Sequence, residues 1–106
     1  MTAGTLRIVL LGRIAIHRDG VPGVGLAGRR PELVFAYLAA EHRRSVSRNE
    51  LADALWPQTL PDTWNAALRT VLSDVRRFLE RGGLDPARTL ISEGGNLRFL
   101  MPDEPG

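Results

Sequence analysis

Residues 47–79, SRNELADALWPQTLPDTWNAALRTVLSDVRRFL, decide the fold because they encode two helices joined by a short, proline-bounded connector. Ser47 and Glu50 have the spacing of a capping box, in which the Ser47 hydroxyl accepts from the amide of Glu50 and the Glu50 carboxylate reaches back to the amide of Ser47. Apolar residues follow at helical spacing. Pro57 then ends the helix because it lacks an amide proton and its ring clashes with the preceding turn. A helix of about two turns is therefore expected.

A second and longer helix is predicted after the connector Pro57–Pro61, with Asp62 or Thr63 as its N-cap. Its apolar residues recur at the i, i+3, i+4, i+7 spacing of a single buried stripe. The stripe comprises Trp64, Ala67, Leu68, Val71, Leu72, Val75, Phe78 and Leu79. Gly82 and Gly83 end the helix, as glycine does where a left-handed residue is needed.

The opposite face of this long helix carries arginine and small hydroxyl side chains. It comprises Ala66, Arg69, Thr70, Ser73, Arg77 and Glu80, with Asp74 and Arg76 on its flanks. Arginine donates two hydrogen bonds to guanine O6 and N7, and short hydroxyl groups reach either bases or phosphates. Such a face suits contact with DNA. The alternative is an ordinary solvated helix face, and the elements before and after the helix weigh against it.

A hairpin is predicted downstream, where two strand-like runs, 89–93 and 96–100, flank Gly94–Gly95. Glycine supplies the positive φ that a two-residue turn needs. The residues expected to face inward are Leu90, Leu97 and Phe99. A helix-turn-helix followed by a hairpin is the winged-helix arrangement, in which Arg98 is a candidate for phosphate or minor-groove contact. A solvated strand arginine is the alternative for Arg98.

An antiparallel sheet is predicted upstream, in the first part of the chain. Residues 6–11 and 14–18 are rich in branched apolar side chains and are separated by Gly12, which is typical of two strands. The turn Asp19–Gly20 ends the second strand. Residues 24–26 add a short third one.

A first helix is predicted to begin at Arg29, with Pro31 in the first turn, where its missing amide proton is not needed. It is expected to end near Arg43 and Arg44, whose charges suit a helix C-terminus. Trp56 and Trp64 lie on either side of the connector. We expect both to anchor the second and third helices in the core.

In this order, the elements resemble the winged-helix effector domain of the OmpR/PhoB type, and specifically the version at the N-terminus of actinobacterial antibiotic regulatory proteins, the SARP family. The matching segments together cover nearly the whole chain. They are residues 6–12, 46–51, 54–56, 67–79 and 84–86. The resemblance implies an α+β winged helix-turn-helix: an N-terminal antiparallel sheet, three helices and a C-terminal β-hairpin wing. The DNA-binding domain is expected at residues 1–101, and residues 102–106 are expected to begin a linker or tail.

The resemblance also implies a function, which is sequence-specific binding of double-stranded DNA by a transcriptional activator. The third helix would enter the major groove and the wing the adjacent minor groove. The expected DNA-contacting residues are Arg48, Asn65, Arg69, Thr70, Ser73, Asp74, Arg76, Arg77 and Arg98. The connector residues Gln58, Thr59 and Leu60 resemble the loop through which such regulators contact RNA polymerase. Members of the family bind direct repeats as head-to-tail pairs and usually carry a further helical regulatory domain.

Two departures from the family pattern concern the surface expected to meet DNA. Asp74 stands where the family usually has a basic residue. Its carboxylate would repel phosphates, accept from a cytosine N4 amine, or pair with Arg77 one turn away. The wing carries Asn96–Phe99 where a Gly-Tyr-Arg ending is more usual. A second hypothesis therefore stays open, in which the winged helix binds a protein and has little affinity for DNA.

Composition indicates one small globular domain, since the chain has 106 residues, of which 43% are hydrophobic and 25% charged. It contains no cysteine, which fits a cytoplasmic protein, and no signal-peptide pattern or long apolar run that would predict a membrane protein. The formal net charge is +2, and all 14 basic residues are arginine. Arginine-favouring codons of a GC-rich genome are the plainest explanation.

An enzyme is not expected, because no pair of nucleophile and base can be named. His17 and His42 lack a second ligand at metal-binding spacing, so no metal site is predicted. The glycine-rich residues 20–28 match neither a P-loop nor a dinucleotide fingerprint, so no cofactor is predicted.

Overall fold

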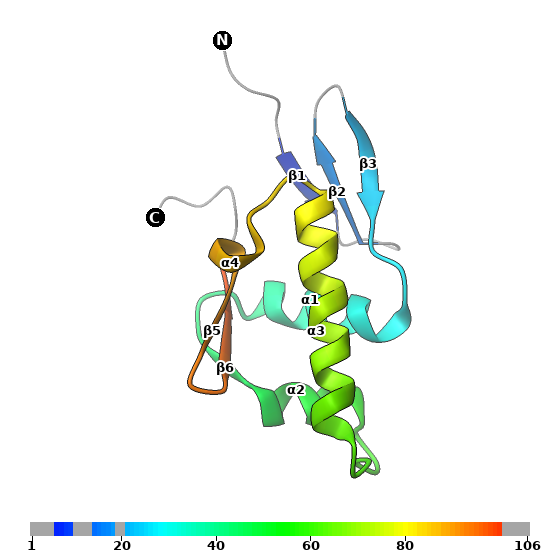
Figure 1. Ribbon diagram of the computed structural model, residues 1–106, viewed down its shortest axis with the longest axis vertical. Coiled ribbons are helices and arrows are strands. Elements are labelled where there is room, and N and C mark those ends of the chain that lie inside the picture. The colour runs from blue at the N-terminus through cyan, green and yellow to red at the C-terminus, as the bar shows by residue number, and fades with distance from the viewer. Residues whose placement is uncertain (1–5, 10–13, 19–20, 101–106) are drawn as a thin grey trace.

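Two small antiparallel sheets and four helices make up the computed structural model, which describes residues 6–9, 14–18 and 21–100 (Figure 1). The elements in chain order are β1 (Leu6–Val9), β2 (Ala15–Arg18), β3 (Val21–Gly25), α1 (Arg29–Ala40), β4 (Val46–Ser47), α2 (Arg48–Leu55), α3 (Trp64–Arg81), α4 (Pro86–Thr89), β5 (Leu90–Glu93) and β6 (Asn96–Phe99). Strand order is β1-β2-β3 in one sheet and β4-β6-β5 in the other. The predicted α+β winged helix is confirmed.

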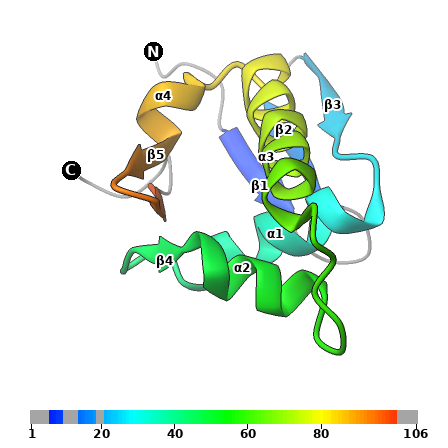
Figure 2. The same cartoon turned by 60° about the horizontal axis from the view of Figure 1, so that its bottom comes forward.

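The long helix α3 lies between the other parts of the molecule. In Figure 1 it runs along the front, with the hairpin β5–β6 on one side and the β1–β3 sheet near its C-terminal end. Helices α1 and α2 lie together beneath it in the turned view of Figure 2. The predicted apolar stripe faces this interior, and six of its residues are buried. They are Leu68, Val71, Leu72, Val75, Phe78 and Leu79.

Three phenylalanines hold the helices and the wing hairpin together. Phe35 of α1 meets Phe78 of α3 edge to face, with ring centroids 5.4 Å apart, and meets Phe99 of β6 in the same manner at 5.2 Å. Phe35 and Phe78 are fully buried, and Phe99 is 1% exposed. Each such aromatic pair contributes about 0.5–1.5 kcal/mol beyond the burial of its surface. Phe35 therefore connects α1 to both the long helix and the wing.

Two helix ends differ from the sequence predictions. The prediction that α1 continues to Arg43–Arg44 is wrong: the helix ends at Ala40, and Arg44 turns back to pair with Glu41 instead of covering the helix C-terminus. Thr63 occupies the N-cap position of α3, but its side chain makes no capping hydrogen bond. Its backbone is not extended there, so the hydroxyl is not aimed at the first amides of the helix.

Two neighbouring glycines at the C-terminal end of α3 have different structural roles. Gly83, with φ of 86°, is the left-handed residue, whereas Gly82 has an ordinary φ of −79°. The amide of Leu84 donates to the carbonyl of Leu79 at 2.9 Å, and that of Gly83 to Glu80 at 3.0 Å, which is a Schellman motif. Gly82 is needed for a different reason: a Cβ there would lie 2.5 Å from Cδ1 of Ile16 in β2.

The wing hairpin is confirmed. Gly94 and Gly95 form its turn with φ of 55° and 82°, and Glu93 lies opposite Asn96. The inward residues are buried as predicted, namely Leu90, Leu97 and Phe99. Arg98 is exposed on the other face. The wing also has a third strand, β4, in which Val46 pairs with Leu97 of β6. The sequence did not predict it, because a strand of two residues has no recognisable pattern.

Two further differences concern short elements. Helix α4 was not expected; the Asp85 side chain caps it by accepting from the amide of Ala87 at 3.0 Å. The third strand of the first sheet is longer than predicted, since β3 spans Val21–Gly25. The predicted strand end at 10–11, Gly12 and the turn at 19–20 lie outside the described residues.

We predict that Gly82→Ala lowers the free energy of unfolding by about 1–3 kcal/mol, because its new methyl group must displace a buried side chain. Ile16 is only 2% exposed, and its Cβ and Cγ2 would also lie 3.1 Å from the added Cβ. Urea denaturation would measure the change. Gly25→Ala is the matched control, because a Cβ there has nothing within 4 Å. Equal stability of the two variants would contradict this role of Gly82.

Candidate nucleic-acid interface

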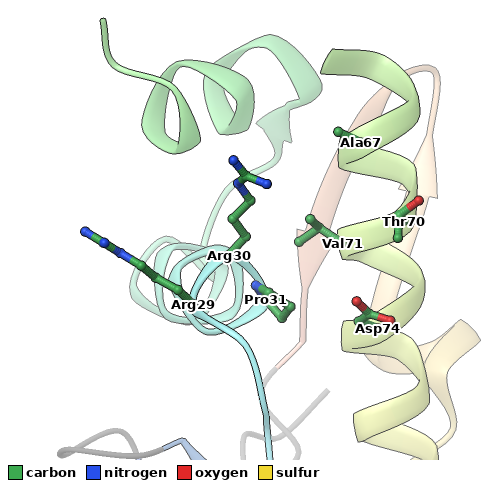
Figure 3. Close-up of a pocket in the computed structure, with 7 residues that line it drawn as sticks. All are labelled: Arg29, Arg30, Pro31, Ala67, Thr70, Val71 and Asp74. Atoms are coloured by element: carbon green, nitrogen blue, oxygen red, sulfur yellow. The ribbon is translucent and has the colours of Figure 1, made fainter. Parts of the chain in front are cut away.

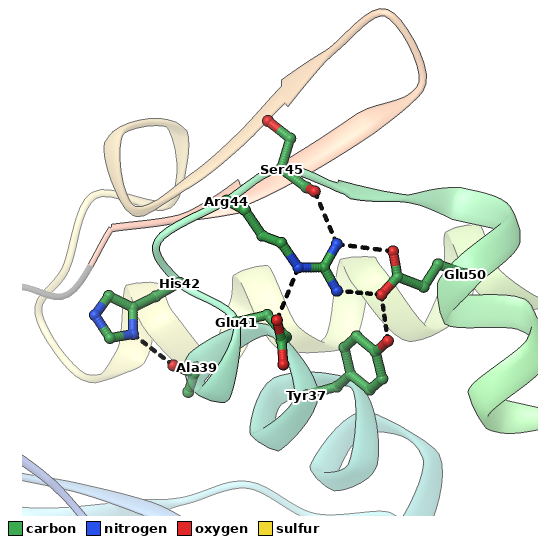
Figure 4. Close-up of polar contacts among 7 residues, drawn as sticks. All are labelled: Tyr37, Ala39, Glu41, His42, Arg44, Ser45 and Glu50. Carbon is green, nitrogen blue, oxygen red and sulfur yellow. Dashed lines mark hydrogen bonds and ion pairs between the residues drawn. The ribbon is translucent and has the colours of Figure 1, made fainter.

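The start of α2 is fixed by a side-chain cap and a cluster of charged groups. The amide of Glu50 donates to the Ser47 hydroxyl at 3.0 Å, as the capping box predicted. The Glu50 carboxylate, however, binds mainly the Arg44 guanidinium and the Tyr37 hydroxyl (Figure 4). Arg44 also donates to Glu41 at 2.8 Å. This cluster connects α1, the turn after it and α2, so it sets the position of α2.

The same cluster shifts the acidity of Glu50. Hydrogen bonds from Arg44 and then from Tyr37 lower the pKa of Glu50 from 4.5 to about 2, and the backbone amide of Ser47 adds a smaller contribution. The hydrogen bond to Glu50 in turn raises the pKa of Tyr37. Glu50 therefore stays ionised at neutral pH and holds both partners.

Two residues that the sequence predicted as DNA contacts, Arg48 and Asn65, bind each other. Nη2 of Arg48, the first residue of α2, donates to the backbone carbonyl of Asn65 at 3.2 Å and also to its side-chain oxygen. The backbone amide of Arg48 donates to the carbonyl of Gly95 at 3.2 Å, in the turn of the wing. Arg48 thus joins α2, the start of α3 and the wing hairpin.

The outward face of α3 is exposed at the positions that the helical pattern predicted. Arg69, Thr70, Ser73 and Arg77 all face solvent, and Arg76 is half-buried. The Thr70 hydroxyl donates to the carbonyl of Ala66 at 3.3 Å, which leaves its oxygen free to accept. The helix therefore presents two guanidinium groups and two hydroxyl groups over its middle turns.

Of the three roles that the sequence left open for Asp74, the structure contains the pairing with Arg77. Nη2 of Arg77 lies 3.3 Å from Oδ1 of Asp74, so the predicted pairing one turn along the helix is present. The Arg77 side chain is 66% exposed and that of Asp74 is 40% exposed. Exposed pairs of this kind are weak, typically about 0–1 kcal/mol. Arg77 can leave this pair when another anion approaches.

Arg98 extends the basic surface onto the wing. It lies opposite Ile91 in the hairpin and is exposed. Within the part of the chain that the structure describes, the guanidinium groups of Arg98 and Arg69 make no hydrogen bond and no ion pair. Both guanidinium groups are therefore available to bind an external anion.

The connector between α2 and α3 projects beyond the first turn of α3 (Figure 1). Its residues Gln58, Thr59 and Leu60 are all exposed, and Leu60 is an apolar side chain at 42% exposure. Trp64 is partly buried against the core as predicted. Trp56 differs from its prediction: it is the C-cap of α2 and is not among the side chains that pack against the core. Its ring lies under the guanidinium of Arg30, 5.2 Å away.

No family model matches the chain. Among curated proteins, the transcriptional regulatory protein EmbR of Mycobacterium tuberculosis is 30% identical over 94 residues, which are 89% of this chain and 24% of EmbR. The regulatory protein AfsR of Streptomyces coelicolor is 32% identical over 93 residues, which are 88% of this chain and 9% of AfsR.

A solved structure agrees with these relatives. The structure of Mycobacterium tuberculosis EmbR in complex with a low-affinity phosphopeptide superimposes with a TM-score of 0.79 at 28% identity, covering 94% of this chain and 26% of that chain. This chain is a winged-helix domain of the SARP type. The SARP-type domain spans about a quarter of EmbR and less of AfsR. EmbR is named a transcriptional regulatory protein and AfsR a regulatory protein.

One further finding concerns the helices of this SARP-type domain. Among the residues described, no helix combines the length and the apolar character that crossing a membrane requires.

We predict that Glu50→Gln destabilises the domain at neutral pH, because a neutral amide loses the charged contacts to Arg44 and Tyr37. Since folding lowers the pKa of Glu50 from 4.5 to about 2, its stabilising contribution is complete above pH 4.5 and is lost as the pH falls toward 2. Urea midpoints measured across this pH range should therefore fall more for the wild type than for Glu50→Gln.

Glu93→Gln provides the matched control, since Glu93 is exposed at the end of β5 and its side chain makes no hydrogen bond within the described residues. Its pH profile should follow that of the wild type. If Glu50→Gln had the same pH profile too, the charged cluster would not stabilise α2.

Proposed function

We propose that this chain binds double-stranded DNA as the DNA-reading domain of a transcriptional regulator, with α3 in the major groove and the wing at the adjacent minor groove. The observation that carries this proposal is the exposed face of α3, which presents Arg69 and Arg77, together with the exposed Arg98 on the wing. The naming of EmbR as a transcriptional regulatory protein supports it.

Base reading falls to the central turns of α3 in this proposal. Arg69 is exposed and unpaired within the described part of the chain, so its guanidinium can bind guanine O6 and N7. Ser73, one turn further along, reaches a base or a phosphate. Thr70 accepts from a base amine through the oxygen that its bond to Ala66 leaves free. Asp74 and Arg77 adjust the charge at the edge of this surface.

Phosphate contacts come from the periphery of the same surface. Arg76 lies on the flank of α3, and Arg98 lies on the wing. Arg48 and Asn65 are joined to each other, so they act as one unit at the start of α3. Such contacts set the register of the protein on the duplex without reading its sequence.

Activation of transcription is proposed through the connector. Gln58, Thr59 and Leu60 are exposed beyond the first turn of α3, on a segment that DNA bound along α3 would leave accessible. An exposed leucine in a polar loop suits a protein partner, which we propose to be RNA polymerase. Binding to direct repeats as a head-to-tail pair is proposed as well.

A second candidate function is supported by Asp74 and by the small formal net charge of +2. A carboxylate beside the outward face of α3 opposes phosphate binding. A winged helix that binds a protein and has little affinity for DNA would fit both observations. It would show no DNA binding at low salt.

We predict that the wild-type chain binds duplex DNA with an affinity that falls steeply as salt is raised, and that Arg69→Ala weakens binding to a selected sequence by about 1–3 kcal/mol. The reason is the loss of a bidentate contact to a base. Fluorescence anisotropy over a salt series would measure both effects. Arg81→Ala is the control on the same helix, since Arg81 is exposed in its last turn and is not among the expected DNA contacts. An affinity for DNA that did not change with salt concentration would contradict the proposed function.

We also predict that Asp74→Asn raises affinity for all duplexes, because it removes one negative charge and releases Arg77 from its pair. The double variant Asp74→Asn/Arg77→Gln should lose this gain, and together with the single variant Arg77→Gln it completes the double-mutant cycle that gives the coupling between the two residues. Selection of bound sequences from random DNA would show whether the preferred bases change. A new preference at one base pair would instead assign Asp74 to cytosine reading.

A further inference from the structure

A groove lies between the start of α1 and the middle of α3, and its α1 wall lies outside the residues that the sequence assigned to DNA contact. Its volume is about 580 Å³. The α1 side contributes Arg29, Arg30 and Pro31, and the α3 side contributes Ala67, Thr70, Val71 and Asp74 (Figure 3). One wall of the groove is therefore basic, and the other is the flank of the proposed recognition helix.

The two arginines on the α1 wall have no acidic partner in the described part of the chain. Both residues are exposed, and neither guanidinium makes a hydrogen bond or an ion pair within residues 6–9, 14–18 and 21–100. Arg30 is nevertheless held in place, because its guanidinium lies over the ring of Trp56 at 5.2 Å. This contact uses the π-face of the ring and leaves the N–H donors of Arg30 available.

The position of the groove relative to the wing gives it a role. In Figures 1 and 2 the wing lies on one side of α3 and the start of α1 on the other. A helix in the major groove, which is about 12 Å wide, has a sugar-phosphate strand along each of its sides. The wing side already carries Arg98. On the other side, Arg29 and Arg30 are the exposed basic residues at the groove.

We propose that Arg29 and Arg30 bind backbone phosphates of the DNA strand that borders α3 on the side opposite the wing. The inference rests on the proposed function and adds a second phosphate-binding flank to it. The groove is lined by two arginines and one carboxylate, that of Asp74, whose charge is already partly offset by Arg77 at 3.3 Å. The side chains of Arg29 and Arg30 extend away from Asp74 (Figure 3). The groove thus has the charge that a phosphate requires.

In this proposal, the second flank also explains how DNA can bind although the Asp74 carboxylate lies beside the outward face of α3. Asp74 lines the same groove as the two arginines, so a phosphate strand there meets guanidinium groups on one wall and Asp74 on the other. The arginines offset the repulsion that Asp74 alone would exert. Phosphate contacts carry no sequence information, so the flank contributes affinity and register, and α3 retains the base reading.

The test is the salt dependence of DNA binding by the 106-residue chain and its variant Arg29→Gln/Arg30→Gln. Each lost phosphate contact reduces the slope of log affinity against log salt by about 0.9, so the double variant should lose about 1.8 in slope and on the order of tenfold or more in affinity at ~0.1 M salt. Two duplexes serve as probes: one selected on the wild type and one unrelated duplex of equal length. Affinity should fall by the same factor for both, because the contacts are not sequence-specific.

Arg43→Gln is the matched control, since Arg43 is an exposed arginine beyond the opposite end of α1 and its loss measures the general effect of one charge. Circular dichroism confirms that each variant is folded. Ethylation interference then locates the contact: phosphates that matter for the wild type and cease to matter for the double variant should lie on the strand away from the wing.

The outcomes separate this inference from the function on which it rests. No salt-sensitive binding by the wild type overturns the proposed function. Normal binding by the wild type together with an unchanged slope in Arg29→Gln/Arg30→Gln overturns only the second flank. A loss of slope no greater than that of Arg43→Gln, or a loss confined to the selected duplex, also overturns it.

Discussion

The architecture depends on the edge-to-face contacts of Phe35 with Phe78 and Phe99. These rings come from α1, α3 and β6, which are far apart in the sequence, and together they set the distance between α3 and the wing. Because the interior is close-packed, a change in one ring is felt by both others. The surface formed by α3 and the wing is therefore a product of the core beneath it, although none of its own residues belongs to that core.

Polar contacts then fix the smaller elements on this frame. The Glu50 carboxylate holds Arg44 and Tyr37, which ties α2 to α1, and Arg48 ties α2 to the wing turn. Both sets of contacts come from the first three residues of α2, which include Arg48 and Glu50. A short helix with only two buried residues cannot be positioned by apolar packing alone, so charged side chains complete the task.

Periodic and local signals made most of the fold predictable. The apolar stripe of α3, the capping box of α2 and the glycine pair of the wing each act over a few residues, so they can be recognised without tertiary context. What the sequence could not show depends on distant partners. β4 is too short to have a pattern, Gly82 is required by the side chain of Ile16, and Arg44 pairs with Glu41 and Glu50 beyond the end of α1. The stack of Arg30 on Trp56 joins segments with no sequence relationship, so the α1 side of the surface was missed.

The contacts of Arg48 have a consequence for association. Since its side chain binds Asn65 and its amide binds Gly95, the start of α3 and the tip of the wing are both hydrogen-bonded to the first residue of α2, which restricts their relative motion. An already ordered surface loses little conformational entropy when it meets a partner. The same rigidity fixes the separation between the two elements, so a partner of different dimensions must itself deform, and the energy of that deformation becomes a basis for discrimination.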